Sequence, residues 1–129
     1  MTDTEFMITK VQLFLDDSLR RAPWKGNSNR FAGHCYVASE ALFHLLPGMK
    51  PQFIRHRGQP HWFLLDPDGN VVDATASQFG TPVPYENAKG KGFLTKEPSK
   101  RARILMERVR EYPSPPCVCD YCALQYYSA

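Results

Sequence analysis

The sequence predicts an α+β fold, in which a small antiparallel sheet packs against helices. Three stretches show the apolar spacing of amphipathic helices, and short runs rich in β-branched and aromatic residues lie between the second and third. With 129 residues, 43% of them hydrophobic and 22% charged, the chain has the composition of one ordinary globular domain. We expect residues 1–112 to form that domain and residues 113–129 to form a cysteine-containing C-terminal tail.

The helices are bounded by residues that favour or stop helical backbone. The first is expected over residues 4–20, where apolar residues recur near one face. The second begins near residue 34 and stops at Pro47-Gly48, a strong termination signal. The third covers about residues 98–111, because Pro98 suits a first helical turn.

Three short strands are expected between the second and third helices, over residues 51–56, 61–65 and 70–75. Asp66-Pro67-Asp68-Gly69 joins the last two, with a proline suited to the second turn position and a glycine free to take positive φ. Residues 81–92 contain further prolines and glycines, and they are expected to form a long loop.

Cys35 opens the second expected helix and is the first candidate for chemistry. The positive end of a helix dipole and the unpaired backbone N–H groups there favour a thiolate. A thiolate attacks carbonyl carbon, and the same N–H groups can bind the resulting oxyanion. The alternative is a small buried residue that packs on the sheet.

His61 and Asp73 are the second candidate pair, and their placement depends on the hairpin register. A three-residue loop pairs Phe63 with Asp73, so that His61 and Asp73 are diagonal neighbours on one face, within side-chain reach. A four-residue loop would shift the pairing by one and place them on opposite faces. In the first register the aspartate can hold the imidazole in one tautomer while its other nitrogen faces the thiol.

These residues lie in motifs that resemble the transglutaminase-like branch of papain-fold enzymes. Gly33-His34-Cys35 opens a helix, His61-Trp62 lies on a strand, and Asp73-Ala74-Thr75 lies on the next strand. The family shows an Asp-Pro-Thr at that last place, so Ala74 is a departure from its pattern. The resemblance covers about residues 29–79 and implies a papain-like or transglutaminase-like core.

The resemblance also implies roles for individual residues. Cys35 would be the nucleophile, His61 the general acid and base, and Asp73 the residue that orients His61. The implied function is a cysteine-dependent acyl hydrolase or acyl transferase of the peptidase, amidase or deamidase type. Its substrate would be a protein, a peptide or a small amide or ester, and catalysis would require no cofactor.

Further residues are expected around the same cleft. By the same resemblance, Asn29, six residues before Cys35, is a candidate side-chain donor to the oxyanion, because a glutamine takes that relative place in papain-like peptidases; Asn27 is an alternative for that role. His34 is expected to line the cleft or to be exposed, and Trp62 is a candidate for the cleft although a place in the core is the preferred interpretation.

A second chemical pattern lies in the tail, where Cys117, Cys119 and Cys122 are spaced Cys-x-Cys-x-x-Cys. Three such thiolates can share one tetrahedral zinc ion when a fourth ligand comes from elsewhere. The alternative is a tail with incidental thiols. A structural zinc leads to a second hypothesis, a zinc-stabilised small binding module for nucleic acid or an acidic protein partner, without catalysis.

The positive charge of the chain is concentrated in residues 89–110, which hold eight basic and two acidic residues, whereas the whole chain carries +3. This basic segment suits an acidic partner, although the solvated face of a helix is the preferred explanation. The chain contains neither a signal-peptide pattern nor a run long enough to span a membrane, so a cytoplasmic location without membrane contact is expected. Residues 90–101 resemble segments of small bacteriophage proteins. This resemblance implies that the protein would act in the cytoplasm of the host cell.

Overall fold

The first helix, α1 (Asp3–Phe14), begins at a capping box. The computed structural model describes residues 2–21, 24–29, 31 and 33–111. The Thr2 hydroxyl accepts a hydrogen bond from the Glu5 N–H, and the Glu5 carboxylate accepts one from the Thr2 N–H, each at 3.1 Å. Both bonds satisfy donors that a helix start leaves unpaired, which explains why α1 begins there.

The single helix expected over residues 4–20 is divided in two. After Phe14 the backbone becomes extended, and Asp17–Leu19 form a short 3-10 turn, η1. Asp16 caps this turn, because its side chain accepts a hydrogen bond from the Ser18 N–H at 3.0 Å. Short polar side chains of this kind compete with helical hydrogen bonds, so the apolar spacing predicted too long a helix.

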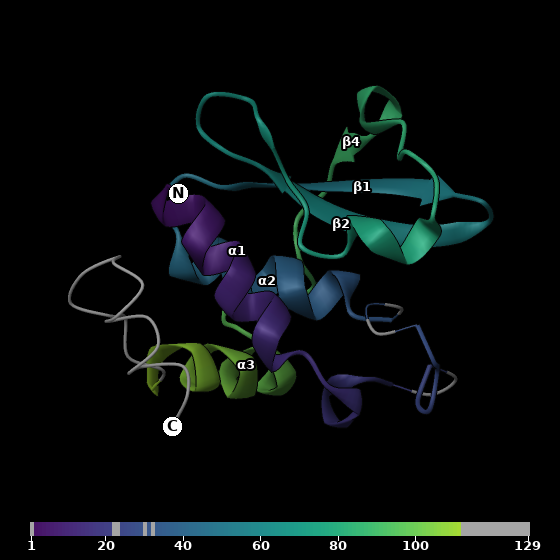
Figure 1. Ribbon diagram of the computed structural model, residues 1–129. Coiled ribbons are helices and arrows are strands. Elements are labelled where there is room, and N and C mark those ends of the chain that lie inside the picture. The colour runs from purple at the N-terminus through teal and green to yellow at the C-terminus, as the bar shows by residue number, and fades with distance from the viewer. Residues whose placement is uncertain (1, 22–23, 30, 32, 112–129) are drawn as a thin grey trace, which may run out of the picture.

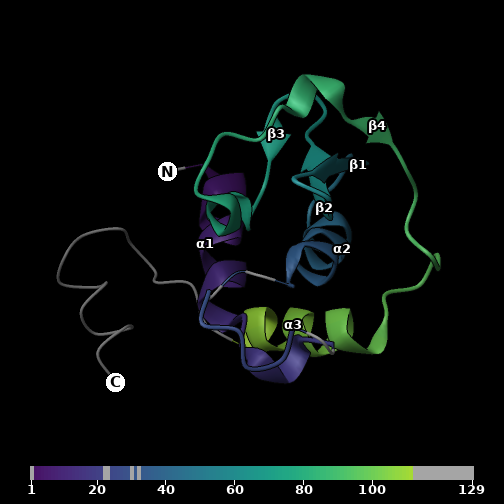
Figure 2. The same cartoon turned by 90° about the vertical axis from the view of Figure 1, so that its right-hand side faces the viewer.

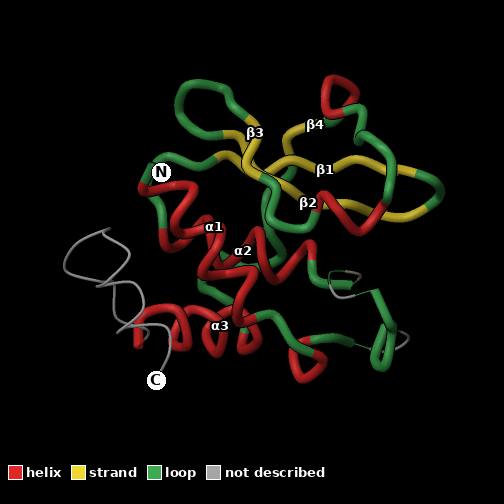
Figure 3. The backbone as a smooth tube through the Cα atoms, in the orientation of Figure 1, coloured by secondary structure: helices red, strands yellow, loops and turns green. Residues whose placement is uncertain are grey.

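Among the described residues, the sheet has four strands in the order β3-β2-β1-β4 (Figure 3). Every neighbouring pair is antiparallel. Their bounds are β1 Lys50–His56, β2 Gln59–Leu65, β3 Val71–Val72 and β4 Lys89–Gly90. Strand β3 is shorter than expected, and β4 lies in the segment expected to be only a loop. Because β4 is two exposed residues, it has no alternating apolar pattern that could have predicted it.

The register of the β2–β3 hairpin is the one on which the His61–Asp73 pairing depends. Leu65 pairs with Val71, as the three-residue loop predicts. The Gly69 N–H donates to the Asp66 carbonyl at 3.0 Å, and Gly69 has a φ of 86°, which glycine adopts without strain. The hairpin prediction is therefore confirmed.

Helix α2 (Cys35–Leu45) lies at the centre of the molecule, between the sheet and helix α3 (Lys100–Glu111) (Figures 1 and 2). Helix α1 lies beside α2, and these elements share the main core. The sheet is covered on its second face by a smaller cluster that contains Phe63 and Val83. The α+β prediction is confirmed. In the part of the chain that is described, no helix is long and apolar enough to span a bilayer.

A buried carboxylate joins α2 to the start of α3. Glu40 is fully buried, and its carboxylate accepts hydrogen bonds from the Ser99 N–H at 2.8 Å and the Ser99 hydroxyl at 2.6 Å. The Ser99 hydroxyl also accepts from the Ala102 N–H at 3.2 Å. The negative charge thus lies at the positive end of the α3 dipole, where it stabilises the helix and fixes it against α2.

We predict that Glu40→Gln lowers the free energy of unfolding by about 1–3 kcal/mol, because an amide cannot accept both hydrogen bonds from Ser99. Urea unfolding followed by circular dichroism measures the change. Glu107→Gln, on the exposed surface of α3, should leave the stability almost unchanged. Equal effects of the two substitutions would contradict the role assigned to Glu40.

Candidate active site

Cys35 is the first residue of α2, and the start of this helix differs from the start of α1. The capping position is held by His34, which has helical backbone angles and makes no side-chain cap hydrogen bond. Gly33 before it has a φ of 79°, and the Trp24 side chain lies where a Cβ would be, at 2.6 Å. Only glycine fits this close approach. The first-turn N–H groups of α2 are therefore left without a side-chain cap beside the thiol.

His61 and Asp73 are bonded to each other in the interior of the protein. His61 Nε2 lies 2.6 Å from Asp73 Oδ2, and the two side chains are 0% and 3% exposed. His61 is on β2, and Asp73 follows β3 directly. The hairpin register places both on one side of the sheet, as the sequence predicts.

Two further donors hold the Asp73 carboxylate. The Tyr85 hydroxyl donates to Oδ2 at 2.8 Å, and the Thr75 N–H donates to Oδ1 at 3.1 Å. Burial and the nearby Asp73 charge raise the pKa of Tyr85, so its hydroxyl stays protonated and remains a donor. These bonds replace the water that a buried carboxylate loses. Tyr85 lies in a 3-10 turn, η3 (Tyr85–Asn87), inside the expected loop, and the sequence analysis missed it.

Cys35 also acts on the His61 ring, whose second nitrogen is not used by Asp73. Nδ1 is buried and has no hydrogen-bond partner of ordinary geometry among the described residues. Burial by itself would lower the His61 pKa, but the hydrogen bond and charge of Asp73, together with Cys35, raise it to about 9. The Cys35 Sγ lies 3.8 Å from the Pro60 carbonyl oxygen, next to His61 in the chain. At neutral pH the ring is therefore an imidazolium that is bonded to the Asp73 carboxylate and interacts with Cys35.

This raised pKa predicts that the protein loses stability as the pH rises. Between about pH 6.5 and 9, His61 holds a proton in the folded state but not in the unfolded state. Its contribution is fully present below about pH 6.5 and is lost as the pH rises through about 9, a change of roughly 3 kcal/mol. Urea unfolding across this range measures it. His61→Gln should remove this part of the pH dependence, and an unchanged slope in the variant would contradict the assignment.

A cleft with a volume of about 300 Å³ opens at Cys35. Cys35 itself is 8% exposed, so the thiol lies in the wall of the cleft. Trp62, which the sequence offers as a candidate for the cleft, lines it, and its ring meets that of Tyr36 edge to face at 5.0 Å between centroids. The other lining residues are Arg21, Trp24, Gly33, Tyr36, Pro60, Gln78, Leu94 and Arg101.

The expectation that His34 lines the cleft or is exposed is wrong. Its side chain is fully buried, and neither ring nitrogen has a hydrogen-bond partner among the described residues. Burial lowers the His34 pKa to about 4, so the ring is neutral at physiological pH. Its neighbour Cys35 faces the cleft because adjacent residues on a helix project in different directions.

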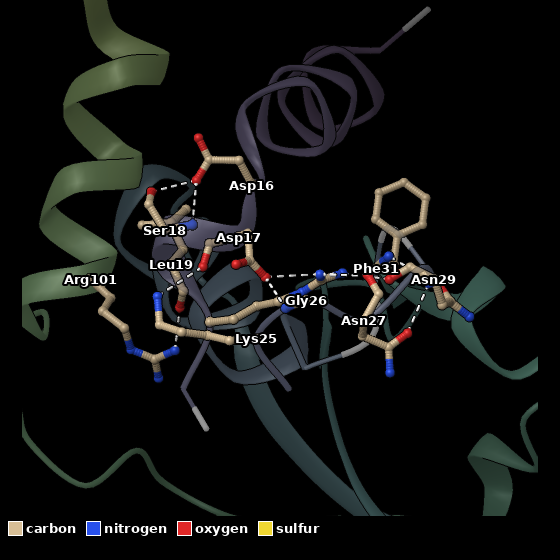
Figure 4. A network of polar contacts seen from close by, with 11 residues as sticks. Asp16, Asp17, Ser18, Leu19, Lys25, Gly26, Asn27, Asn29, Phe31 and Arg101 are labelled. Carbon is tan, nitrogen blue, oxygen red and sulfur yellow. Dashed lines mark hydrogen bonds and ion pairs between the residues drawn. The ribbon is translucent and has the colours of Figure 1, made fainter. Parts of the chain in front are cut away.

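Asn29 does not line the cleft either. Its side-chain amide donates to the Gln78 carbonyl at 2.9 Å and its side-chain oxygen accepts from the Phe31 N–H at 3.1 Å. Asn27 binds the Asn29 N–H at 2.8 Å, so both asparagines stabilise the loop before α2 (Figure 4). Asn29 therefore positions Gln78, and the expected role as an oxyanion donor does not fit this geometry.

Gln78 is an uncharged polar side chain in the cleft, and the sequence offers it only as one of the residues that follow the third strand. It lies in a 3-10 turn, η2 (Ala76–Phe79), and lines the cleft together with Cys35. Its side-chain oxygen is buried and has no hydrogen-bond partner among the described residues. A carboxamide next to a thiol can stabilise an oxyanion through its N–H groups. No sequence pattern singles out this glutamine, because polar residues commonly follow strands.

The remaining predicted features lie partly outside this site. Cys117, Cys119 and Cys122 fall beyond the described residues, so the structure does not place the zinc ligands. Within the described part of the chain, no group of three or more His, Cys, Asp or Glu side chains is arranged to hold a metal ion. The basic segment, residues 89–110, includes β4 and nearly all of α3, whose outer face carries exposed basic side chains.

Comparisons with known proteins give no further identification. No family model, no curated protein and no solved structure matches the chain.

Proposed function

We propose that the protein is a cysteine-dependent acyl hydrolase or acyl transferase. Cys35 is the nucleophile, His61 the general acid and base, and Asp73 the residue that orients His61. The observation that carries this proposal is the 2.6 Å His61–Asp73 bond, which leaves the other ring nitrogen near a thiol at an uncapped helix start. Buried ionisable groups with strongly shifted pKa values are typical of catalytic sites.

The resemblance to the transglutaminase-like branch of papain-fold enzymes supports the same roles. The cysteine, histidine and aspartate occur in that order in the chain, on a helix, on a strand and after the next strand. The central position of α2 against an antiparallel sheet is consistent with such a core (Figure 1).

The proposed reaction has two steps. The Cys35 thiolate attacks a carbonyl carbon, and the oxyanion is held by first-turn N–H groups of α2 and the Gln78 amide. As the intermediate collapses, His61 gives its proton to the departing amine or alkoxide, and a thioester on Cys35 remains. His61 then takes a proton from water or an amine, which attacks the thioester. The bond between the acyl carbon and Sγ then breaks, which releases the acyl group as an acid or an amide and regenerates the Cys35 thiolate.

The cleft limits the size of the acyl group. A volume of about 300 Å³ lies at the lower end of the range for small-molecule sites. We therefore propose that a short or protruding part of a protein or peptide, or a small amide or ester, enters beside Cys35.

Gln78→Leu should slow acylation of Cys35 by about 10²-fold, because one oxyanion donor is lost while the side chain keeps a similar volume. The release of p-nitrophenolate from p-nitrophenyl acetate measures the rate. Gln59→Leu, at an exposed position on β2, is the matched control and should leave the rate unchanged. An unchanged rate in Gln78→Leu would remove this residue from the oxyanion site.

Alkylation tests the proposed nucleophile without a known substrate. At pH 6 iodoacetamide should modify Cys35 faster than the three tail cysteines, as measured for each cysteine by peptide mass spectrometry, because the uncapped start of α2 and the charged His61 ring activate its sulfur. His61→Gln should slow the modification of Cys35 by roughly tenfold or more and leave the tail cysteines unaffected. A Cys35 that reacts no faster than the tail thiols, or reacts independently of His61, would contradict the proposed function.

A further inference from the structure

Two arginines lie in the wall of the cleft that contains Cys35. Arg21 follows the η1 turn, whereas Arg101 is in the first turn of α3, far away in the sequence. Folding brings both beside the same thiol. Burial lowers the pKa of Arg101, and the nearby charge of Arg21 lowers it further, a sign that the two charges repel each other.

Arg101 is held in place by its backbone contact. Its Nη1 donates to the Leu19 carbonyl oxygen at 2.5 Å, so the guanidinium reaches from α3 to the segment after α1 (Figure 4). Its Nε is buried and has no hydrogen-bond partner among the described residues. A buried, unpaired guanidinium donor is costly unless a ligand binds it.

The described residues of the cleft contain no acidic side chain to neutralise these charges. The ion pairs of other arginines in the described chain use Asp16 and Asp17. Glu40 is the acidic residue that acts on Arg101, but both of its carboxylate oxygens accept hydrogen bonds from Ser99. The cleft therefore presents positive charge beside the nucleophile.

We propose that Arg21 and Arg101 bind a carboxylate of the substrate, so that the enzyme acts on acyl groups next to an acidic residue or a free chain terminus. This inference rests on the proposed function, since it names the substrate class of the same site. Guanidinium groups bind carboxylates through paired N–H donors, which fixes both the position and the orientation of the substrate. The aromatic side chains of the cleft would cover the uncharged part of the ligand.

Two alkylating reagents that differ in charge test this proposal. Iodoacetate carries a carboxylate, whereas iodoacetamide is neutral and has nearly the same size. Arg21→Gln and Arg101→Gln should each slow the reaction of Cys35 with iodoacetate by about fivefold and change the reaction with iodoacetamide little. Arg101→Lys, which keeps the charge, should preserve most of the iodoacetate rate even if the hydrogen bond to Leu19 is lost.

The matched control is Arg110→Gln, at the other end of α3, which should leave both rates unchanged. Arginine variants that leave the ratio of the two rates unchanged would overturn the carboxylate site but not the nucleophile. A Cys35 that is unreactive towards both reagents would instead contradict the proposed function.

Protection experiments identify the source of the carboxylate. We would measure how three acetylated tetrapeptides slow iodoacetamide modification of Cys35. One carries a glutamate side chain and an amidated end, one a glutamine and a free terminal carboxylate, and one a glutamine and an amidated end. Stronger protection by the first assigns a side-chain carboxylate, and stronger protection by the second assigns the terminus. Equal protection by all three peptides would overturn the proposal.

Discussion

Replacing Cys35 by alanine should abolish acyl transfer while leaving the protein folded. With p-nitrophenyl acetate, the native protein should release p-nitrophenolate and carry an acetyl group on Cys35, detected by peptide mass spectrometry. Cys35→Ala should lower the rate of this reaction by about 10⁴-fold or more, because the atom that forms the covalent bond is lost. The thiol is small and only 8% exposed, so alanine fits the same position with little change in thermal stability.

Cys35→Ser is the control for shape and polarity. Serine keeps a hydroxyl in the same place, but an alcohol beside an imidazolium is a far weaker nucleophile than a thiolate. We therefore expect this variant to remain nearly inactive and to show no acetylated serine. If either variant reacts at the native rate, Cys35 is not the nucleophile. The release of p-nitrophenolate would then come from acetylation of the tail cysteines.

The sequence predicts the positions of Cys35, His61 and Asp73 because local sequence patterns determine them. Asp66-Pro67-Asp68-Gly69 determines the loop length of the hairpin, and the loop length determines the register that brings His61 to Asp73. Cys35 is placed at the start of a helix because the apolar spacing of the following residues predicts that helix, which stops before Pro47-Gly48. Each step depends on neighbouring residues in the chain, which is why it could be derived without coordinates.

The residues that were missed reach the site through loops. Tyr85 and Gln78 lie in 3-10 turns, and their contacts depend on how those turns pack over the sheet. No periodicity indicates where a side chain in such a turn points. Arg101 belongs to a predicted helix, but its place in the cleft depends on how α3 packs across α2. The start of that helix is fixed by Glu40, a long-range contact that sequence spacing cannot reveal.

Asn29 and His34 show a different reason for error. The resemblance to papain-like enzymes suggests Asn29, and adjacency to Cys35 suggests His34, whereas the direction of a side chain decides whether it enters the cleft. Asn29 binds the Gln78 carbonyl, and His34 lies in the interior. The residue that Asn29 holds, Gln78, is the one that lines the cleft.

Asp73→Asn should lower the rate of Cys35 acylation by about 10²-fold at pH 7, within the range by which a positioned acid or base accelerates a reaction. The carboxylate accepts from His61, Tyr85 and the Thr75 N–H, whereas an asparagine turns one of its two oxygens into a donor. The new NH2 group then faces either the Thr75 N–H or both His61 and Tyr85, so at least one donor loses its acceptor. The variant should therefore also lose about 1–3 kcal/mol of stability.

The pH profile separates this catalytic role from lost stability. His61 acts as an acid only while protonated, and the Asp73 charge helps to raise its pKa to about 9, so native activity should fall on the alkaline side near that pH. Without the charge, the His61 pKa moves back towards 6.5, and the alkaline fall should move to lower pH. Asp68→Asn, in the exposed turn of the same hairpin, should leave the profile unchanged. A purely structural loss would lower the rate by the same factor at every pH at which the protein is folded. If Asp73→Asn keeps the pH profile of the native protein, Asp73 therefore supports the fold but does not tune the His61 pKa.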